Sequence, residues 1–503
     1  MKLTIGDIIK ACGGRAQIFE SADENFEVTG VYLDSRMVTE GAVFVAQKGE
    51  RVDGHSFIGQ VFEKGASLVI CEKEPGQVRD EFGTDPASWE NYILVEDSLI
   101  ALKKIAKAYR EKLKIPFVGI TGSVGKTSTK EFVAGVLSEK YNVLKTEGNY
   151  NNEIGVPLTL LRIREEHEAA VVEMGISDFG EMTRLTEMVQ PDIAVITNIG
   201  QCHLENLGTR DGILKAKTEI FGGMKKGGYA VLNGNDDKLI TIGDVNGNAP
   251  LFFGEKGCGE EGRFAVSIES STDNGLLGSS AVIAVDTAVS KNLNEKIGEI
   301  RDKISVNVPL PGHHMVINAA AATGVALLLG LKLPEIKSGI ENMKPISGRN
   351  SIVTVGDITL IDDCYNANPV SMRSSIDLLM LAKGRKVAIL GDMFELGEDE
   401  KKMHRGVGKY AAENGSDIIL CAGELSRETF EGANDVLKEG REKNESSTSD
   451  LHWWKTRDEL ISAVKEDITS GERKLIPEGS AVLVKASHGM HFEEIVKSLK
   501  ELF

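Results

Sequence analysis

Short apolar runs separated by amphipathic segments recur along most of the chain. Apolar runs of about 4 to 8 residues are typical of buried strands, and longer segments with a period of 3.6 residues are typical of helices. In the first part, this pattern predicts a helix over residues 99–113 and strands over residues 28–33, 41–46, 68–71 and 92–95. These residues are therefore expected to form a small α/β unit.

From residue 117 onward, strand-like runs alternate with helical patterns. The expected strands are residues 117–121, 169–173, 193–198 and 229–232, with a helix over residues 130–137. Such alternation is typical of a parallel sheet with crossover helices. Residues 254–280 are rich in glycine and serine and predict hairpins or loops. Residues 319–331 predict a buried helix that is too short to span a bilayer.

A third zone begins near Gly348 and again predicts an α/β sheet. Its expected strands are residues 358–362, 387–390, 417–421 and 481–485, separated by helical segments as in a doubly wound domain. Residues 438–450 are polar and poor in apolar side chains, so they predict a mobile surface loop.

Length and composition agree with this division into three zones. The chain has 503 residues, whereas a single domain usually contains about 100–200. Hydrophobic residues make up 41% and charged residues 27%, which is typical of soluble globular proteins. We therefore predict an α/β protein of three domains. They are an N-terminal α/β module over residues 1–113, a central parallel sheet with helices over residues 114–347, and a C-terminal Rossmann-like, doubly wound domain over residues 348–503.

Charge and cysteine content narrow the class of partner. The formal net charge of −18 disfavours nucleic acids and anionic membranes, because both carry negative charge. The six cysteines form no CxxC pair, which argues against a zinc site or a disulfide framework and favours a reducing compartment. The N-terminal residues lack the apolar run of a signal peptide, and no heptads are present. We therefore expect a cytoplasmic monomer with small-molecule partners.

The most informative segment is residues 117–129, FVGITGSVGKTST, in which a strand leads through glycines into a helix. Such a loop directs backbone N–H groups to one site at a helix N-terminus, which favours phosphate. Lys126 would reach the β- and γ-phosphates of a nucleotide, and the Thr127 hydroxyl would bind Mg²⁺. Ile120 replaces the first glycine of the general phosphate-loop pattern; a glycine-rich turn without a ligand is the alternative. The expected ATP-binding residues of the loop are Gly122, Ser123, Val124, Gly125, Lys126, Thr127 and Ser128.

The shortened loop TGSVGKTS resembles that of the Mur ligase family and its folylpolyglutamate synthase relatives. Further segments, in matching order from about residue 30 to about residue 490, resemble the members of this family that use D-alanyl-D-alanine. They are TEGNYNNEIGVP (146–157), EMGISDFGEM (173–182), PDIAVITNIGQCHLE (191–205), IDDCYNANPVSM (361–372), LGDMFELG (390–397) and VLVKAS (482–487). The DNPR-type motif of the neighbouring ligase that adds the third stem residue is absent.

The resemblance implies an ATP-dependent ligase of peptidoglycan precursor synthesis. ATP would phosphorylate the terminal carboxylate of UDP-N-acetylmuramoyl-tripeptide, and the amine of D-alanyl-D-alanine would attack the resulting acyl phosphate. The products would be UDP-N-acetylmuramoyl-pentapeptide, ADP and phosphate. Because two anions meet in the first step, metal ions and lysines are needed to reduce their repulsion. The N-terminal domain would bind the UDP-muramoyl substrate, the central domain ATP, and the C-terminal domain D-alanyl-D-alanine while completing the ATP site.

The resemblance also implies two Mg²⁺ ions. Thr127 and Glu173 would bind the first. His203 would bind the second, beside Lys217, which the family carbamylates with CO₂ to give an anionic ligand. Lys126 would act in catalysis with these residues. Judged by residue type alone, Glu173 would be solvated or a helix cap, His203 structural, and Lys217 an exposed helix lysine.

Further nucleotide contacts follow from the same resemblance. Asn318 would hydrogen-bond adenine, since an amide both donates and accepts. Met315 stands where the family usually has an asparagine. Arg349 would reach the ATP phosphates across the domain cleft, or would form an interdomain salt bridge instead. Asp363 would contact the ribose.

Small, basic and amide side chains are the implied contacts of the two other substrates, because they suit diphosphates, sugar hydroxyls and peptide groups. For the UDP-muramoyl substrate they are Ser35, Arg36, Lys48, His55, Thr146, Asn149, Asn151, Asn152 and Ser177. For D-alanyl-D-alanine they are Asn366, Asn368 and Lys485. Ala486 and His488 stand where the family more often has a glycine and an arginine. His488 and His491 form an HxxH pair without a third ligand, which favours structural or substrate contacts over zinc.

The sequence leaves other functions open. The chain could be a sister muramoyl ligase or a folylpolyglutamate synthase, although the latter lacks the UDP module. It could also be a non-catalytic scaffold, or a P-loop switch ATPase without peptide chemistry. Three domains around one cleft further predict closure, by rotation of the third domain near Gly348, to bring the substrates together and exclude water.

Overall fold

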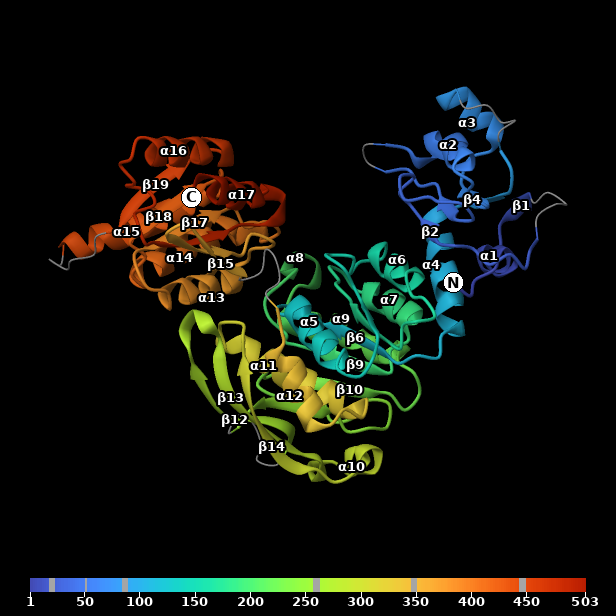
Figure 1. Cartoon of the computed structure of the whole chain (residues 1–503), viewed down its shortest axis with the longest axis horizontal. Helices are drawn as coiled ribbons and strands as arrows, with labels where there is room; N and C mark the ends of the chain where they lie inside the picture. Colours follow the sequence, from blue (N-terminus) through green and yellow to red (C-terminus); the bar gives the residue numbers. More distant parts are fainter. Residues whose placement is uncertain (18–22, 50–51, 84–88, 257–262, 345–350, 443–448) are drawn as a thin grey trace.

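The computed structural model describes residues 1–17, 23–49, 52–83, 89–256, 263–344, 351–442 and 449–503. Three β-sheets, each formed by a separate stretch of chain, are flanked by helices. In Figure 1 the central part lies at the bottom of a V, with the N-terminal part at the upper right and the C-terminal part at the upper left. The predicted α/β class with three sheet-containing domains is confirmed.

The N-terminal sheet has the strand order β1–β5–β4–β3–β2. Strand β1 is antiparallel to β5, and the other neighbours are parallel. The strands are β1 (Arg15–Gln17), β2 (Val31–Tyr32), β3 (Val43–Val45), β4 (Leu68–Cys71) and β5 (Tyr92–Leu94). The helices are α1 (Ile5–Cys12), α2 (Ile58–Glu63), α3 (Pro75–Phe82) and α4 (Ser98–Lys112). Each predicted apolar run contains a strand, although β2 and β3 are shorter than expected.

Helix α4 joins the N-terminal part to the central part. The Tyr109 hydroxyl donates to the carbonyl of Ile163 at 2.7 Å, and Arg110 Nε donates to the carbonyl of Val189 at 2.7 Å. The buried Arg110 guanidinium also lies 3.6 Å from the centroid of the Phe117 ring. One apolar core therefore continues across α4, and the predicted boundary at residue 113 falls directly after this helix.

The central sheet has the order β14–β13–β12–β11–β10–β9–β6–β8–β7. Its strands are β6 (Phe117–Thr121), β7 (Val143–Lys145), β8 (Ala169–Glu173), β9 (Ile193–Ile196), β10 (Tyr229–Asn233), β11 (Leu251–Glu255), β12 (Phe264–Asp273), β13 (Ser279–Asp286) and β14 (Arg301–Val308). The strands from β12 to β7 in this order, β6 included, are parallel to one another, whereas β12, β13 and β14 form an antiparallel meander. Residues 254–280, predicted as hairpins or loops, hold most of the β12–β13 hairpin.

Helices cover both faces of the central sheet. They are α5 (Lys126–Leu137), α6 (Gly155–Leu161), α7 (Glu181–Val189), α8 (Leu204–Leu207), α9 (Arg210–Thr218), α10 (Lys291–Ile297), α11 (His313–Leu328) and α12 (Leu333–Glu341). Because side chains alternate along a strand, Phe117 of β6 joins the core under α6 and α7, whereas Val118 and Ile120 join the core under α5 and α11. Burial on both faces therefore explains the nearly continuous apolar run of β6, from Phe117 to Ile120.

The C-terminal sheet has the order β15–β16–β20–β17–β18–β19. Strand β15 is antiparallel to β16, and the others are parallel. The strands are β15 (Ser351–Val355), β16 (Ile358–Asp362), β17 (Lys386–Gly391), β18 (Ile418–Ala422), β19 (Asp450–Trp454) and β20 (Ala481–Lys485). The helices are α13 (Pro369–Met380), α14 (Glu400–Glu413), α15 (Ser426–Glu442), α16 (Arg457–Thr469) and α17 (Glu493–Leu502).

The prediction of a surface loop over residues 438–450 is wrong at both ends of this range. Helix α15 continues to Glu442, and β19 begins at Asp450. Helix formers such as Glu and Lys occupy residues 438–442, so helix propensity outweighs their polarity. Residues 443–448 lie outside the described residues, as does the boundary predicted at residue 347.

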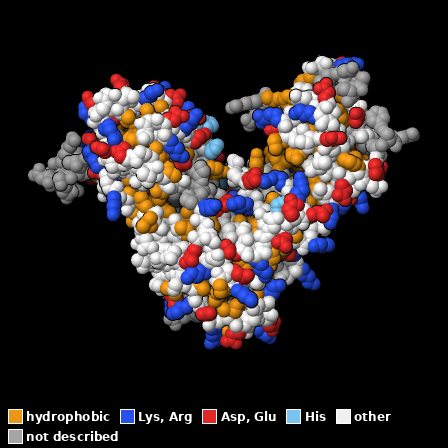
Figure 2. Space-filling view, in the orientation of Figure 1, with side chains coloured by type: hydrophobic (Ala, Val, Ile, Leu, Met, Phe, Trp, Pro, Cys, Tyr) orange, Lys and Arg blue, Asp and Glu red, His pale blue; other side chains and the backbone are white. Residues whose placement is uncertain are grey.

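The space-filling view shows a hollow between the N-terminal and C-terminal parts, above the central part (Figure 2). In the described portion of the chain, we find no helix long and apolar enough to cross a membrane. Parallel strands β6, β8 and β9 are neighbours and end at the same edge of the central sheet. Polar residues that follow these strands are thereby brought together.

Candidate nucleotide and metal site

The phosphate loop connects β6 to α5 as predicted. Ile120 lies inside β6 and is fully buried, so the loop begins at Gly122. Gly122 has φ 148°, and a Cβ there would lie 1.9 Å from Thr197 Oγ1. Gly125 has φ 83° and precedes the first residue of α5. The loop conformation therefore requires glycine at both positions.

The segment after β9 supports this loop. Asn198 accepts from the backbone N–H of Ser123 at 3.0 Å through its carbonyl and from that of Val124 at 3.0 Å through Oδ1. Ser123 Oγ in turn accepts from the N–H of Gly200 at 2.9 Å. The first turn of α5 leaves its own N–H groups without intrahelical acceptors and offers them to an anion. These residues therefore fit a nucleotide phosphate.

Thr127 and Glu173 form the polar centre of the site. Thr127 Oγ1 donates to Glu173 Oε2 at 2.8 Å, and Asn151 Nδ2 donates to Glu173 Oε1 at 2.8 Å. Glu173 is 1% exposed, which excludes the solvated role that its residue type alone favours. A hydroxyl and a carboxylate are oxygen ligands of the kind that Mg²⁺ prefers, so the donor set fits this ion.

Two lysines of α5 face this centre. Lys126 Nζ donates to the carbonyl of Gly122 at 2.9 Å and lies over the loop. Lys130, which the sequence analysis missed, is 1% exposed, with Nζ 2.7 Å from the carbonyl of Thr146 and 3.8 Å from Glu173 Oε2. Lys130 is four residues after Lys126, so the two side chains lie on one face of the helix. This spacing could have indicated from the sequence that Lys130 also lies near Glu173. Asn198 was also missed, although a polar residue directly after a parallel strand is such a signal.

Lys217 and His203 complete the central group. Lys217 lies on α9 and is 1% exposed, and among the described residues Nζ has no hydrogen-bond acceptor or carboxylate within bonding distance. Burial, and next the charge of Lys126, lower the pKa of Lys217 to about 7. Burial, and next the charges of Lys217 and Lys126, lower the pKa of His203. Lys217 is therefore no exposed helix lysine, and His203 lies in the same electrostatic environment.

The described residues contain no cluster of three His, Cys, Asp or Glu side chains arranged to hold a metal ion. Complete coordination would therefore need the Thr127 hydroxyl, a modified lysine, water or phosphate oxygens. Such mixed ligand sets, with water and phosphate included, are usual for Mg²⁺.

Of the predicted adenine and ribose residues, Asn318 lies beside the phosphate-loop helix, whereas Asp363 lies in the C-terminal part. Asn318 of α11 accepts from Thr129 Oγ1 at 2.9 Å, and its Nδ2 lies 3.7 Å from Met315 Sδ. Met315 therefore packs directly against the side-chain amide of Asn318, three residues later on the same helix. Asp363 is buried in the C-terminal part, where it accepts from Ser375 Oγ at 2.5 Å and pairs with Lys485. Arg349 lies outside the described residues.

The predicted UDP contacts fall into two groups. Arg36 and Lys48 are exposed, with Arg36 paired to Asp34 at 2.7 Å. Ser35 is buried, and its carbonyl accepts from Lys64 Nζ at 2.8 Å. His55 is also fully buried, and both ring nitrogens are engaged: Nδ1 lies 2.6 Å from Asp53 Oδ1, and Nε2 accepts from the N–H of Glu72 at 2.9 Å. As placed, His55 supports its loop and has no free nitrogen for a ligand.

The predicted muramoyl-peptide residues likewise fall into two groups, one that supports neighbouring residues and one that is exposed. Thr146 is fully buried, and its Oγ1 accepts from the N–H of Glu173 at 3.0 Å, so Thr146, like Asn151, supports Glu173. Asn152 Oδ1 accepts from the N–H of Gly155 at 2.8 Å at the start of α6. Asn149 and Ser177 are exposed.

In the C-terminal part, the predicted acceptor residues have different environments. Lys485 is 1% exposed and donates to the carbonyl of Asn366 at 3.1 Å. Asn368 caps α13 by accepting from the N–H of Ser371 at 2.9 Å. Asn366 and His488 are exposed, and the His488 ring lies edge-on to Tyr365 with centroids 5.5 Å apart.

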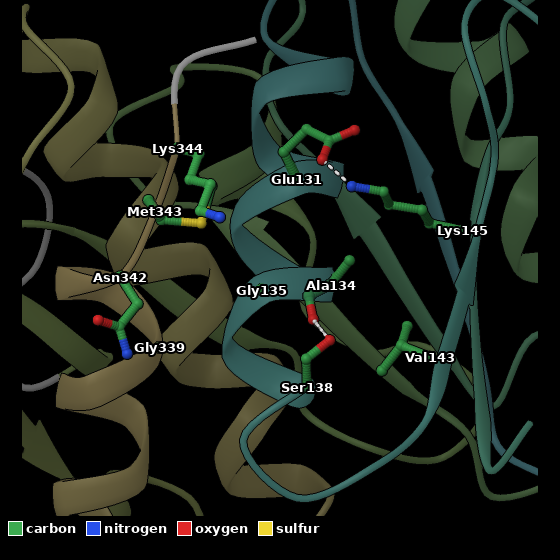
Figure 3. A pocket seen from close by; sticks show the side chains of 10 residues that line it. All are labelled: Glu131, Ala134, Gly135, Ser138, Val143, Lys145, Gly339, Asn342, Met343 and Lys344. Atoms are coloured by element: carbon green, nitrogen blue, oxygen red, sulfur yellow. Dashed lines mark hydrogen bonds and ion pairs between the residues drawn. The ribbon is translucent and has the colours of Figure 1, made fainter.

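A separate cavity of about 460 Å³ lies further along α5, between this helix and α12 (Figure 3). Glu131, Lys145 and Lys344 stand around it, with Glu131 paired to Lys145. No residue predicted for nucleotide, metal or substrate binding lines this cavity. It is therefore distinct from the site at the phosphate loop.

The phosphate loop, the buried Thr127–Glu173 pair and the three sheets define a P-loop nucleotide-binding protein of the α/β class. Family models identify its three parts: "Mur ligase family, catalytic domain" matches residues 27–110, "Mur ligase middle domain" residues 120–326, and "Mur ligase, glutamate ligase domain" residues 348–488. The chain belongs to the Mur ligase family.

The chain is similar to ligases from several bacteria. The UDP-N-acetylmuramoyl-tripeptide–D-alanyl-D-alanine ligase of Bacillus subtilis (strain 168) is 34% identical, over 95% of this chain and 94% of the relative. The ligase of the same name from Escherichia coli (strain K12) is 31% identical, over 94% of this chain and 93% of the relative. A crystal structure of MurF from Acinetobacter baumannii has a TM-score of 0.81 at 30% identity, covering 99% of both chains. MurF ligase from Thermotoga maritima, in complex with ADP, has a TM-score of 0.73 at 27% identity, covering 94% and 97%.

Proposed function

We propose that this protein is the ATP-dependent ligase that joins D-alanyl-D-alanine to UDP-N-acetylmuramoyl-tripeptide, with UDP-N-acetylmuramoyl-pentapeptide, ADP and phosphate as products. The observation that carries the proposal is the buried Thr127–Glu173 pair beside the phosphate loop. Relatives that match along nearly the whole chain and bear this ligase name support the choice of substrates. The reaction would be a cytoplasmic step of peptidoglycan precursor synthesis, carried out by a monomer.

The chemistry explains why such a site is needed. A carboxylate is a poor electrophile at neutral pH, so the tripeptide carboxylate is first converted to an acyl phosphate by ATP. The amine of D-alanyl-D-alanine then attacks the acyl carbon, and the tetrahedral intermediate expels phosphate. Because the first step brings two anions together, Lys126 and the N-terminus of α5 stabilise the charge that develops on the transferred phosphoryl group.

Four side chains would hold two Mg²⁺ ions: Thr127 and Glu173 the first, His203 and carbamylated Lys217 the second. Bound Mg²⁺ would neutralise phosphate charge and orient the transferred group. Carbamylation with CO₂ is supported by the lowered pKa of Lys217, about 7, because CO₂ reacts only with the unprotonated amine.

The nucleotide contacts would be residues 122–128 of the loop, Asn318, Arg349 and Asp363. The proximity of Asn318 to the start of α5 supports its assignment. For the UDP-muramoyl substrate, the exposed side chains of Arg36, Lys48, Asn149 and Ser177 would make direct contacts. Ser35 would contribute from the same loop as Arg36. Thr146, Asn151, Asn152 and His55 would act by holding these segments in place.

D-alanyl-D-alanine would bind to the C-terminal domain. Asn366 would contact it directly, whereas Lys485 and Asn368 would shape the surrounding loop. In this assignment residues 1–113 bind the UDP-muramoyl substrate, residues 114–347 bind ATP, and residues 348–503 bind the acceptor and complete the ATP site.

Phosphate release tests this function. It is measured with ATP, UDP-N-acetylmuramoyl-tripeptide and D-alanyl-D-alanine, and then with each component left out in turn. The ligase function predicts release at the full rate only when all three are present. Release with ATP alone at that rate would identify a switch ATPase instead, and no release under any condition would favour a non-catalytic scaffold.

A further inference from the structure

One loop of the C-terminal part faces the candidate metal site. Residues 392–397 follow β17 and carry Glu395, whose Oε2 atom lies 3.9 Å from His203 Nδ1 of the central part. The side chain of Glu395 is 80% exposed and has no other partner among the residues that the structure describes. Its carboxylate therefore serves no contact within its own domain.

Buried hydrogen bonds fix the base of this loop. The N–H of Met393 donates to His404 Nε2 at 2.9 Å, and the N–H of Phe394 donates to Ser487 Oγ at 2.9 Å. His404 and Ser487 are both buried. Glu395 itself has φ 62°, in the left-handed region that residues other than glycine rarely adopt. Its partner His203 has φ 50°, so the surrounding structure holds both facing residues in an unfavourable backbone conformation.

The distance between the two side chains indicates what they share. At 3.9 Å, Glu395 Oε2 and His203 Nδ1 are too far apart for a hydrogen bond. Imidazole nitrogens and carboxylate oxygens are both ligands of divalent cations. Because Mg²⁺ binds its ligands at about 2.1 Å, a single ion can bridge two ligand atoms up to about 4.2 Å apart.

We propose that Glu395 supplies a carboxylate ligand from the C-terminal domain to the cation that His203 binds. This inference rests on the proposed function, which gives His203 that cation. The cation then ties the C-terminal domain to the central domain at the phosphate loop. Its binding and the approach of the bound acceptor to the acyl phosphate are thereby coupled, because both need the C-terminal domain in the same position.

Cation binding by three proteins tests the inference. Mn²⁺, which is paramagnetic and takes similar oxygen and nitrogen ligands, is titrated in the presence of ADP and bicarbonate and followed by electron paramagnetic resonance. The wild type is expected to bind two Mn²⁺ ions. Glu395→Gln is expected to bind the second at least about tenfold more weakly, as is usual when a supporting ligand is lost. Glu398→Gln removes the same charge from an exposed neighbouring position and is expected to bind both ions like the wild type.

A second readout reports domain position. Small-angle scattering is expected to show that Mn²⁺ with ADP compacts the wild type and Glu398→Gln, but compacts Glu395→Gln less. Because Glu395 is exposed, its variant should fold normally, which its thermal unfolding verifies. A second Mn²⁺ bound by Glu395→Gln with wild-type affinity would overturn this inference and leave the proposed function intact. One Mn²⁺ bound by the wild type would instead remove the second cation from the proposed function, and this inference with it.

Discussion

Thr127 Oγ1 donates a hydrogen bond to Glu173 Oε2 across 2.8 Å, although the two residues are 46 positions apart in sequence. The parallel pairing of β6 with β8 brings them together, because Thr127 follows the loop after β6 and Glu173 ends β8. Both side chains are buried, so water does not compete for this hydrogen bond. The pair links the phosphate-binding helix to the carboxylate proposed to bind Mg²⁺.

Replacing Thr127 by alanine should reduce kcat by about 100-fold or more, because a proposed ligand of the Mg²⁺ that would neutralise the phosphate charge is lost. Thr127→Ser keeps the hydroxyl and should retain most of the activity. Steady-state phosphate release by both variants measures the difference. Equal loss in the two variants would mean that the methyl group, and not the hydroxyl, is what matters at this position.

Gly122→Ala should destabilise the protein and abolish ADP binding. The new Cβ would lie 1.9 Å from Thr197 Oγ1, at a φ of 148°. We expect a loss of about 1–3 kcal/mol in the free energy of unfolding, typical of overpacking at a strained position. Urea denaturation and ADP titration measure the two effects. Gly222→Ala, where a Cβ would meet no atom within 4 Å, is the matched control and should change neither.

Lys217→Ala should lose at least about tenfold in activity, and the wild type should depend on bicarbonate, if the lysine acts as a carbamate ligand. Lys215→Ala, two residues earlier on α9 and exposed, should remain active. A carbamate carbon should appear by nuclear magnetic resonance in wild-type protein supplied with ¹³C-bicarbonate and be missing from Lys217→Ala. Full activity of Lys217→Ala without dependence on bicarbonate would refute the modification.

Asp53 should make the N-terminal domain sensitive to acid. Burial by itself raises the pKa of this carboxyl group, but hydrogen bonds from Lys73 and His55 outweigh it and lower the pKa from 3.8 to about 2. Because the folded pKa lies below the unfolded one, the stabilisation is complete above about pH 4 and is lost as the pH falls toward 2. At 1.36 kcal/mol per pKa unit it amounts to about 2 kcal/mol.

Asp53→Asn should therefore lower the free energy of unfolding by about this amount at pH 7 and by about half as much near pH 3. Urea denaturation across this pH range measures the difference between the variant and the wild type. Asp80→Asn, at an exposed position in α3, is the control. A difference that stays constant from pH 7 to pH 3 would show that the ionisation of Asp53 does not contribute.

The hollow between the N-terminal and C-terminal parts predicts closure on binding (Figure 2). Because both substrates and ATP must meet and water must be kept from the acyl phosphate, the radius of gyration should decrease when a non-hydrolysable ATP analogue and UDP-N-acetylmuramoyl-tripeptide bind together. Small-angle scattering measures this change. An unchanged radius at saturating concentrations of both ligands would contradict closure.

Local patterns were sufficient for the phosphate loop. Strand β6, the glycines and helix α5 are contiguous, so periodicity and spacing predict the element order, although the helix begins at Lys126 and not at residue 130 as expected. The ends of β8, β16 and β20 were predicted correctly for the same reason, since each is a compact apolar run. Strand β7 has three residues and the exposed half of β12 is polar, so neither carries a clear apolar signal.

The sequence by itself determined the α/β class, the nucleotide loop and, through its ordered motifs, the resemblance to the Mur ligases. Only the tertiary structure decided which polar residues are exposed and which are buried in support of their neighbours. His55 and Lys485 look like surface contacts in the sequence, yet both are buried with partners. Glu173 looks solvated but is enclosed by Thr127 and Asn151. The physical reason is that burial and hydrogen-bond partners depend on residues distant in the chain, which no local pattern contains.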